Sequence, residues 1–181
     1  MKIVVAITGA SGIILGQRLL EELKGHETHL VITKNAEKVA KFEECKSVKE
    51  IKKLAKFVYD ENEIEAGISS SSYPVDAMVV IPCSMKTLSS IANGFSDNLV
   101  NRAAENILKL NKKLIVVPRD TPLTLAAIQN MEKLKLAGAI ILPANIAYYF
   151  KPRTINDITN FTVGKVLDAL SMEHKLYKRW G

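Results

Sequence analysis

The sequence predicts a doubly wound α/β fold, in which a mostly parallel sheet lies between two layers of helices. Short runs of aliphatic and β-branched residues, typical of strands buried on both faces, alternate along the chain with longer helical patterns. A turn containing two glycines, residues 9–12, follows the first apolar run directly and precedes the first helical pattern. We expect the whole chain, residues 1–181, to form a single domain, because this length supports one complete hydrophobic core.

Five strands and seven helices are expected. The strands are the short apolar runs at residues 2–7, 28–33, 77–81, 113–117 and 139–142. The helices are the patterned stretches at residues 12–24, 34–44, 47–56, 85–93, 98–111, 123–136 and 154–171. Thr154 stands at the start of the last helix, where its hydroxyl can cap the free N–H groups of the first turn.

Composition argues against several classes of protein. No apolar run approaches the ~20 residues that a membrane-spanning helix needs, and the first residues lack the cleavage site of a signal peptide. We therefore expect a cytoplasmic protein that binds no membrane. The net charge of +6 comes from scattered basic residues with few aromatic ones, which favours an anionic small molecule over a nucleic acid.

Cysteine and histidine usage argues against a metal site. Cys45 and Cys83 stand far apart, and no Cys/His cluster accompanies either of them. We expect Cys83 to be a small buried residue, because no histidine partner is visible for a nucleophile. The three histidines, His26, His29 and His174, are expected at the surface.

The residues that follow each strand are the first candidates for a binding site, because ligands of such a sheet lie beyond the carboxyl ends of its strands. These residues are Gly9–Gly12, Thr33–Lys34, Pro82–Thr87, Pro118–Pro122 and Pro143–Asn145. They combine small hydroxyl side chains and basic groups with the N-termini of helices. Such a combination suits a phosphate monoester.

A nicotinamide dinucleotide fits these residues less well than a mononucleotide does. The glycines do not follow the GxGxxG spacing, and Thr33-Lys34 stands where an acidic residue would bind the ribose. The chain also contains no tyrosine that is followed four residues later by lysine, the catalytic pair of the short-chain dehydrogenases.

The longest motifs of the chain resemble the UbiX-type flavin prenyltransferases. They are GASG near the start, VVIPCSMKTLSSIANGFSDNLVNRAAE, VPRDTPLT, AGAIILPANIAYYFKP and the final KRW, and they cover nearly the whole chain. The resemblance implies a Rossmann-like flavoprotein that binds FMN and uses its reduced form as a substrate. It also implies transfer of the dimethylallyl group of dimethylallyl monophosphate to N5 and C6 of that flavin. The product, prenylated FMN, would serve a UbiD-type decarboxylase, and the protein would form a homo-oligomer, a homododecamer as its relatives do.

The resemblance also implies roles for individual residues. Flavin contacts are expected from Gly9, Ala10, Ser11, Thr33, Ser84, Met85, Lys86, Thr87 and Arg119. Substrate contacts are expected from Arg102, Lys109, Arg119, Tyr149 and Lys165, some of them reaching from a neighbouring subunit. Tyr149 and Lys165 match the groups that bind the prenyl phosphate, and Trp180 matches the family's terminal tryptophan. Ser11 and a carboxylate, Glu43 or Asp120, are the expected proton relays, and the phosphate dianion is another candidate base. Asp120 stands where the family commonly has the longer glutamate.

The chemistry of these residues agrees with the resemblance. Prenyl transfer from a diphosphate usually relies on magnesium held by Asp-rich motifs, and this sequence contains no Asp-Asp pair. Fixed cations and a phenol can instead stabilise the charge that develops on a departing monophosphate. Arg119, Lys109, Lys165 and Tyr149 would supply those groups.

Two other functions remain open from the sequence. FMN-dependent cysteine decarboxylases share the fold, but they carry a PASANT-like loop where this chain has PCSMKT and a PxMNxxMW-like motif where it has PANIAYY. Their catalytic histidine falls before the third major strand, and residues 56–74 here contain none. A non-catalytic FMN-binding subunit is the second alternative, and binding of FMN without turnover would distinguish it.

Overall fold

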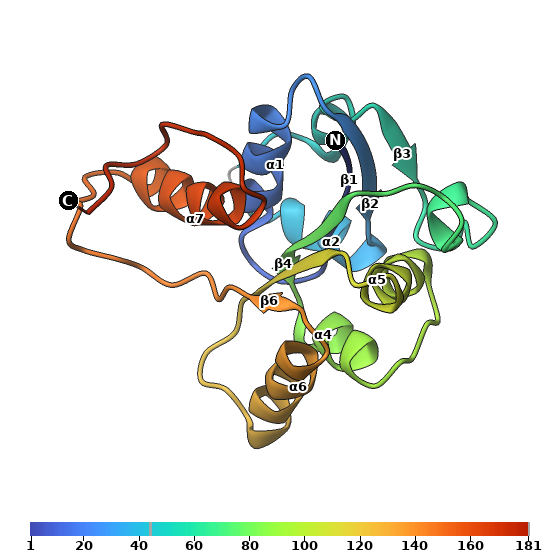
Figure 1. Cartoon of the computed structure of the whole chain (residues 1–181). Helices are drawn as coiled ribbons and strands as arrows, with labels where there is room; N and C mark the ends of the chain where they lie inside the picture. Colours follow the sequence, from blue (N-terminus) through green and yellow to red (C-terminus); the bar gives the residue numbers. More distant parts are fainter. Residues whose placement is uncertain (44, 181) are drawn as a thin grey trace.

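The computed structural model describes residues 1–43 and 45–180, and within them a six-stranded parallel sheet forms the centre (Figure 1). The strands lie in the order β3-β2-β1-β4-β5-β6. Their bounds are β1 (Lys2–Ile7), β2 (Glu27–Ile32), β3 (Phe57–Tyr59), β4 (Ala77–Cys83), β5 (Lys113–Pro118) and β6 (Ile140–Ile141). The order reverses between β1 and β4, which is where a doubly wound sheet opens a crevice for ligands. The predicted fold class is therefore confirmed.

Helices cover both faces of the sheet. They are α1 (Ile13–Glu22), α2 (Lys34–Ala40), α3 (Val48–Lys52), α4 (Met85–Ala92), α5 (Leu99–Lys109), α6 (Leu125–Leu136) and α7 (Ile155–Ala169). A short 3₁₀ turn spans Gly67–Ser69. Helices α1 and α7 share one hydrophobic core with the sheet, whereas α4, α5 and α6 share the other. None of the helices in the described part of the chain has the length and apolar character that crossing a membrane requires.

The structure differs from the sequence-based expectation mainly at the edge of the sheet. Strand β3 was not predicted, because its three residues are only partly buried and the edge position removes the long apolar signal of a central strand. Most helices end one to four residues inside the predicted bounds. The helix predicted over 34–44 ends at Ala40, and its predicted last residue, Glu44, lies outside the described residues. The predicted cap is confirmed, because the Thr154 hydroxyl accepts a hydrogen bond from Asp157 N at 3.2 Å.

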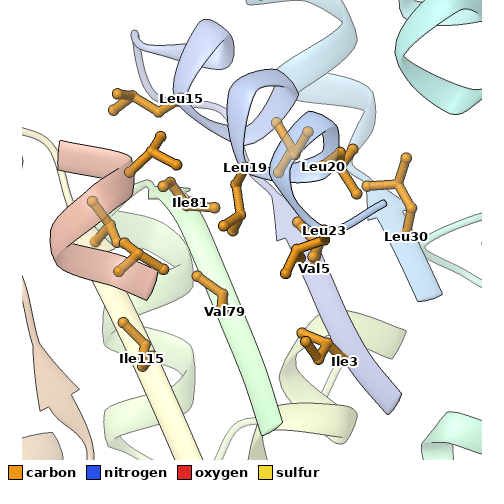
Figure 2. Packing of buried hydrophobic residues seen from close by; sticks show 14 of the residues in the cluster. Ile3, Val5, Leu15, Leu19, Leu20, Leu23, Leu30, Val79, Ile81 and Ile115 are labelled. Atoms are coloured by element: carbon orange, nitrogen blue, oxygen red, sulfur yellow. The ribbon is translucent and has the colours of Figure 1, made fainter. Parts of the chain in front are cut away.

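Side chains of alternate residues in the central strands pack in the two hydrophobic cores on opposite faces of the sheet. Ile3, Val5 and Ile7 of β1 face α1 and α7, whereas Val4 and Ala6 face the other helix layer. Figure 2 shows Leu15, Leu19 and Leu20 of α1, and Leu23 directly after the helix, in the same core as Val5 of β1 and Val79 of β4. This double-sided burial explains why the strands read as continuous apolar runs.

A glycine brings α1 unusually close to the sheet. A Cβ at Gly16 would lie 2.7 Å from both Ile7 Cδ1 and the carbonyl oxygen of Ile81. No larger residue fits without moving backbone of β4. The close approach fixes where the N-terminal end of α1 sits relative to the carboxyl ends of β1 and β4.

His29 is fully buried, so the expectation that it lies at the surface was wrong. Its ring stacks on Phe57 with 4.9 Å between centroids, and its Nδ1 lies 2.9 Å from the Tyr59 hydroxyl. The unpredicted strand β3 supplies both partners. Burial is the largest effect on the ring and lowers the pKa of His29, with Lys2 and Lys56 acting in the same direction and Glu27 opposing them.

We expect the free energy of unfolding to fall as the pH drops below about 6.5, the ordinary pKa of histidine. The unfolded chain takes up a proton there that the folded chain binds less readily, so acid favours the unfolded state. Denaturant titrations of wild type and His29→Gln between pH 5 and pH 8 test this. The substitution should flatten the pH dependence, whereas the control His26→Gln should leave it unchanged. An equal slope in wild type and His29→Gln would contradict the prediction.

Candidate functional site

Thr8 connects the first and third of the five segments predicted to bind a ligand, which we call the ligand loops and number in chain order. It follows β1 directly and is fully buried. Its hydroxyl donates a hydrogen bond to the Pro82 carbonyl at 2.9 Å and accepts one from Ser84 N at 2.8 Å. The sequence analysis did not single out Thr8, although a polar residue between a strand and a Gly-rich turn is a usable signal.

Replacing Thr8 should therefore loosen the site. Thr8→Val keeps the shape of the side chain but leaves the Ser84 N–H without its partner, which costs about 1–3 kcal/mol. We expect the melting temperature and the affinity for FMN to fall together in this variant. Thr8→Ser keeps the hydroxyl and is the matched control, and it should retain FMN affinity. Equal FMN affinity in the two variants would show that the hydroxyl does not hold the loops.

The GASG turn is shaped by backbone that favours glycine. Gly12 has φ of 104°, in the left-handed region. A Cβ at Gly9 would lie 2.7 Å from Cβ of Asn35, so the turn packs directly against the start of α2. There the Thr33 hydroxyl caps α2 by accepting a hydrogen bond from Ala36 N at 3.2 Å. The structure thus brings the first two ligand loops side by side.

The third loop begins α4. The Ser84 hydroxyl accepts a hydrogen bond from Thr87 N at 3.3 Å and lies 3.1 Å from the Thr87 hydroxyl. Met85 is half-buried, whereas Lys86 is exposed and its Nζ lies 3.7 Å from Asp97 Oδ2. Hydroxyl groups of Thr33, Ser84 and Thr87 therefore gather at the carboxyl edge of the sheet beside the N-terminus of α4, an arrangement suited to an anion, whereas Lys34 N at the start of α2 already donates to the Glu61 carboxylate at 2.9 Å.

Glu43 lies in a turn after α2, where the sequence had predicted the end of a helix. Its two carboxylate oxygens accept hydrogen bonds from Gly12 N at 2.8 Å and Ile13 N at 2.9 Å. The carboxylate thereby satisfies two of the free N–H groups at the start of α1 and complements the positive end of the helix. Gly12, one of the two donors to Glu43, directly follows Ser11 in the chain, so the carboxylate lies beside the turn that carries Ser11.

Arg119 and Asp120 follow β5 at a separate cavity of about 420 Å³. Both side chains are exposed, and the Asp120 carboxylate accepts a hydrogen bond from Thr121 N at 3.0 Å. The opposite side of the cavity is formed by residues 143–146 and Tyr148. Arg119 N donates a hydrogen bond to the Cys83 carbonyl at 3.2 Å, so β4 and β5 are held together where the third and fourth ligand loops begin.

Tyr149 and Trp180 lie together in an aromatic cluster beside α7. Their rings meet edge to face with 5.3 Å between centroids, and Phe161 of α7 lies 5.9 Å from Tyr149. Lys165 is one helical turn further along α7, and its Nζ lies 3.5 Å from Asp168 Oδ2. Burial acts to lower the pKa of Lys165, but the Tyr177 hydroxyl and the Asp168 carboxylate outweigh it and raise the pKa. Lys165 is therefore a permanent cation.

Arg102 and Lys109 lie away from Tyr149 and Lys165, the other residues predicted to bind the prenyl donor. Both belong to α5, which packs in the core on the opposite side of the sheet from α1 and α7. Arg102 pairs with Glu105 at 3.1 Å, and Lys109 is the exposed last residue of the helix.

Cys83 is buried, as the sequence predicted, and burial raises the pKa of its thiol far above neutrality. A protonated thiol is a poor nucleophile, so its part in the site is to pack beneath the third loop. In the described residues, no group of three or more His, Cys, Asp or Glu side chains is arranged to hold a metal ion.

Comparison with known proteins identifies the family. A protein-family model described as Flavoprotein matches residues 1–167. The flavin prenyltransferase UbiX of Methanocaldococcus jannaschii is 50% identical over 182 residues, which cover 100% of this chain and 99% of the relative. The chain belongs to the UbiX flavin prenyltransferase family. The resemblance recognised in the sequence motifs is thereby confirmed.

Solved UbiX-type structures have the same fold. AnUbiX (PadA1), crystallised with FMN and dimethylallyl pyrophosphate, has a TM-score of 0.97 and 40% identity, covering 99% of this chain and 97% of that chain. A dodecameric FMN-dependent UbiX-like decarboxylase from Escherichia coli O157:H7 has a TM-score of 0.97 and 41% identity, covering 100% of both chains. The agreement extends over every strand and helix that carries a predicted site residue.

Proposed function

We propose that this protein is a flavin prenyltransferase that joins the dimethylallyl group of dimethylallyl monophosphate to N5 and C6 of reduced FMN. The observation that carries the proposal is the TM-score of 0.97, over 99% of the chain, with a UbiX structure that holds FMN and dimethylallyl pyrophosphate. The 40% identity to that structure adds sequence similarity to the agreement in fold.

FMN would lie against the three ligand loops that meet beyond β1, β2 and β4. The Thr33 hydroxyl suits the phosphate as a donor. Gly9, Ala10, Ser11 and residues 84–87 would contact the rest of the flavin, with Arg119 at its far side. The hydroxyl groups of these loops can donate to the acceptor-rich phosphate and flavin carbonyls. When bound in its reduced form, FMN supplies the nucleophilic N5 and C6 positions.

Ser11 and Glu43 are proposed to move the proton that N5 loses, with Asp120 acting from the other side of the site. Each oxygen of Glu43 accepts one backbone N–H, and a carboxylate oxygen has room for a further hydrogen bond. Ser11 is exposed and directly precedes Gly12, whose N–H donates to that carboxylate. Glu43 would thus both hold the turn and act as a proton acceptor.

Lys165, Tyr149, Lys109, Arg102 and Arg119 are proposed to bind the prenyl donor. Fixed cations stabilise the negative charge that grows on the departing phosphate, and the aromatic rings of Tyr149 and Trp180 suit the apolar dimethylallyl group. Because Lys109 and Arg102 lie on α5, away from α7, we propose that they complete the site of a neighbouring copy in a homo-oligomer.

A homododecamer, the assembly of the related protein from E. coli O157:H7, is the oligomer we propose. Several large apolar side chains are more than half exposed in the single chain and would be covered by neighbours; they are Phe42, Phe95, Leu125, Leu136 and Ile155.

We further propose that the protein works in the cytoplasm and supplies prenylated FMN to a UbiD-type decarboxylase.

Prenyl transfer should survive an excess of EDTA. A monophosphate held by Lys and Arg side chains needs no bridging magnesium, and the sequence has no Asp-Asp pair to bind one. The measurement is the rate of prenylated FMN formation with and without chelator. Activity that disappears in EDTA and returns with magnesium would overturn the cation-based mechanism.

The function itself is tested by mass spectrometry. The protein is incubated without oxygen with reduced FMN and dimethylallyl monophosphate, and the mass of the released flavin is measured. We expect a flavin heavier by one dimethylallyl-derived group, and a much slower reaction with dimethylallyl pyrophosphate. Flavin that binds but stays unmodified with both donors would favour a non-catalytic FMN-binding subunit.

A further inference from the structure

Asp168, near the end of α7, gathers three hydrogen-bond donors from the residues that follow the helix. We call residues 172–180 the C-terminal segment. The Asp168 carboxylate accepts hydrogen bonds from His174 Nε2 at 3.0 Å, the Tyr177 hydroxyl at 2.6 Å and Arg179 Nη2 at 2.6 Å. Lys165 of α7 is a fourth neighbour, at 3.5 Å. The side chain of His174 is 1% exposed, so its expected place at the surface was wrong as well.

Gly164 provides the surface on which this segment lies. A Cβ at Gly164 would be 2.6 Å from two ring carbons of Tyr177 and 2.7 Å from His174 Cε1. Glycine inside a helix lowers helix stability relative to alanine, and no left-handed backbone requires it here. Its presence is explained by the close packing of the C-terminal segment on α7.

The contacts continue from the C-terminal segment to the proposed prenyl-donor site. The ring of Tyr177 packs on Phe161 with 4.9 Å between centroids, and Phe161 in turn contacts Tyr149. Three residues after Tyr177, Trp180 packs edge to face on Tyr149. The segment also forms one side of a cavity of about 660 Å³, with residues 150–153 on the other. The position of Trp180 thus depends on how the segment is held to α7.

We infer that Asp168 and Gly164 are positioning residues for prenyl transfer: they hold the C-terminal segment on α7 so that Trp180 lies against Tyr149 at the prenyl donor. The inference rests on the proposed function, which assigns Tyr149 and Trp180 to the donor. Asp168 acts through the segment and through Lys165, and Gly164 acts through the segment alone. Neither residue belongs to the loops proposed to bind FMN.

The charge of Asp168 is suited to this task. Burial acts to raise its pKa, but hydrogen bonds from Tyr177, Arg179 and His174 outweigh burial and hold the pKa of the carboxyl well below its usual range. The carboxylate therefore stays ionised at any pH at which the enzyme would be assayed. Stabilisation of the segment is present above the ordinary pKa of aspartate and is lost only in strong acid.

Two variants release the C-terminal segment by independent routes. Asp168→Asn removes the charge that holds three donors. Gly164→Ala keeps the carboxylate and its pairing with Lys165, favours the helix, and pushes Tyr177 and His174 away. Asp157→Asn is the matched control, because Asp157 is a hydrogen-bonded carboxylate of the same helix that caps its other end.

The release is measured on the full chain by trypsin cleavage after Lys175 and Lys178, followed by mass spectrometry. We expect both variants to be cut about tenfold faster than wild type, the size of effect that loss of a charged hydrogen bond produces. The concentration of dimethylallyl monophosphate at half-saturation should rise about tenfold, while the Kd for FMN stays unchanged. The control should match wild type in all three measurements.

Two results would overturn the inference. Unchanged cleavage in both variants would show that Asp168 and Gly164 do not hold the segment. Faster cleavage with an unchanged requirement for dimethylallyl monophosphate would show that the segment does not position the donor site. A wild-type protein that transfers no prenyl group is a different outcome: it removes the proposed function, whereas the cleavage rates still decide whether the two residues hold the segment.

Discussion

Glu43→Gln is expected to lower the rate of prenyl transfer by about 10²–10⁴-fold, the usual contribution of a general acid or base. The amide cannot take the proton that Ser11 would pass on. It also places an NH₂ group against one of the two backbone donors, Gly12 N and Ile13 N, that the carboxylate accepts. We therefore expect a simultaneous loss of stability of about 2–3 kcal/mol, since hydrogen bonds to a charged group are worth about 1.5–3 kcal/mol each.

A second capping carboxylate separates these two effects. Glu50 caps α3 by accepting a hydrogen bond from Ser47 N at 3.0 Å, away from the ligand loops. Glu50→Gln should lower the melting temperature and leave turnover unchanged. Turnover is measured at saturating FMN, so that weaker flavin binding cannot imitate a chemical defect. If Glu43→Gln loses stability but keeps wild-type turnover under these conditions, Glu43 only holds the turn.

Lys165→Ala is expected to weaken use of dimethylallyl monophosphate by about ten- to a hundredfold. The variant removes a fixed positive charge that would face the phosphate dianion, and such a contact is worth about 1.5–3 kcal/mol. Tyr149→Phe removes one neutral donor and keeps the ring on Trp180, so its effect should be smaller. Lys165→Arg keeps the charge and should recover most of the activity.

FMN titrations beside donor saturation curves show which ligand these residues serve. The proposed flavin loops follow β1, β2 and β4, whereas Lys165 and Tyr149 belong to α7 and the segment before it. Neither variant should therefore release FMN. Lost flavin affinity with an unchanged dependence on dimethylallyl monophosphate would mean that Lys165 and Tyr149 bind the other ligand.

The central part of the fold could be read from the sequence because its signals are local. The four central strands, β1, β2, β4 and β5, are buried on both faces, so each one appears as a continuous apolar run. Thr154 was recognisable because a capping hydroxyl acts on a residue three positions away. Loop positions followed from the strands, and the family resemblance named the residues within them.

What the sequence did not reveal depends on contacts that no local pattern encodes. Thr8 meets Ser84 across 76 residues, and Glu43 meets Gly12 across 31. His29 looked like a surface residue because the short strand that covers it had itself been missed. Asp168 is only nine residues from Tyr177, but a turn with no regular repeat joins them, so neither periodicity nor capping rules could find the pair.

The order of the site residues along the chain has a consequence for synthesis on the ribosome. The GASG turn and Thr33 emerge first, and Thr8 finds its partner only when β4 has been made. Trp180 follows every strand and helix of the described chain, and Asp168 can collect its three donors only after Arg179 has left the exit tunnel. In a nascent chain, the loops proposed to bind FMN can thus come together before the contact between Trp180 and Tyr149 has formed. Neighbouring copies would then add Arg102 and Lys109 of α5 to the donor site of each chain.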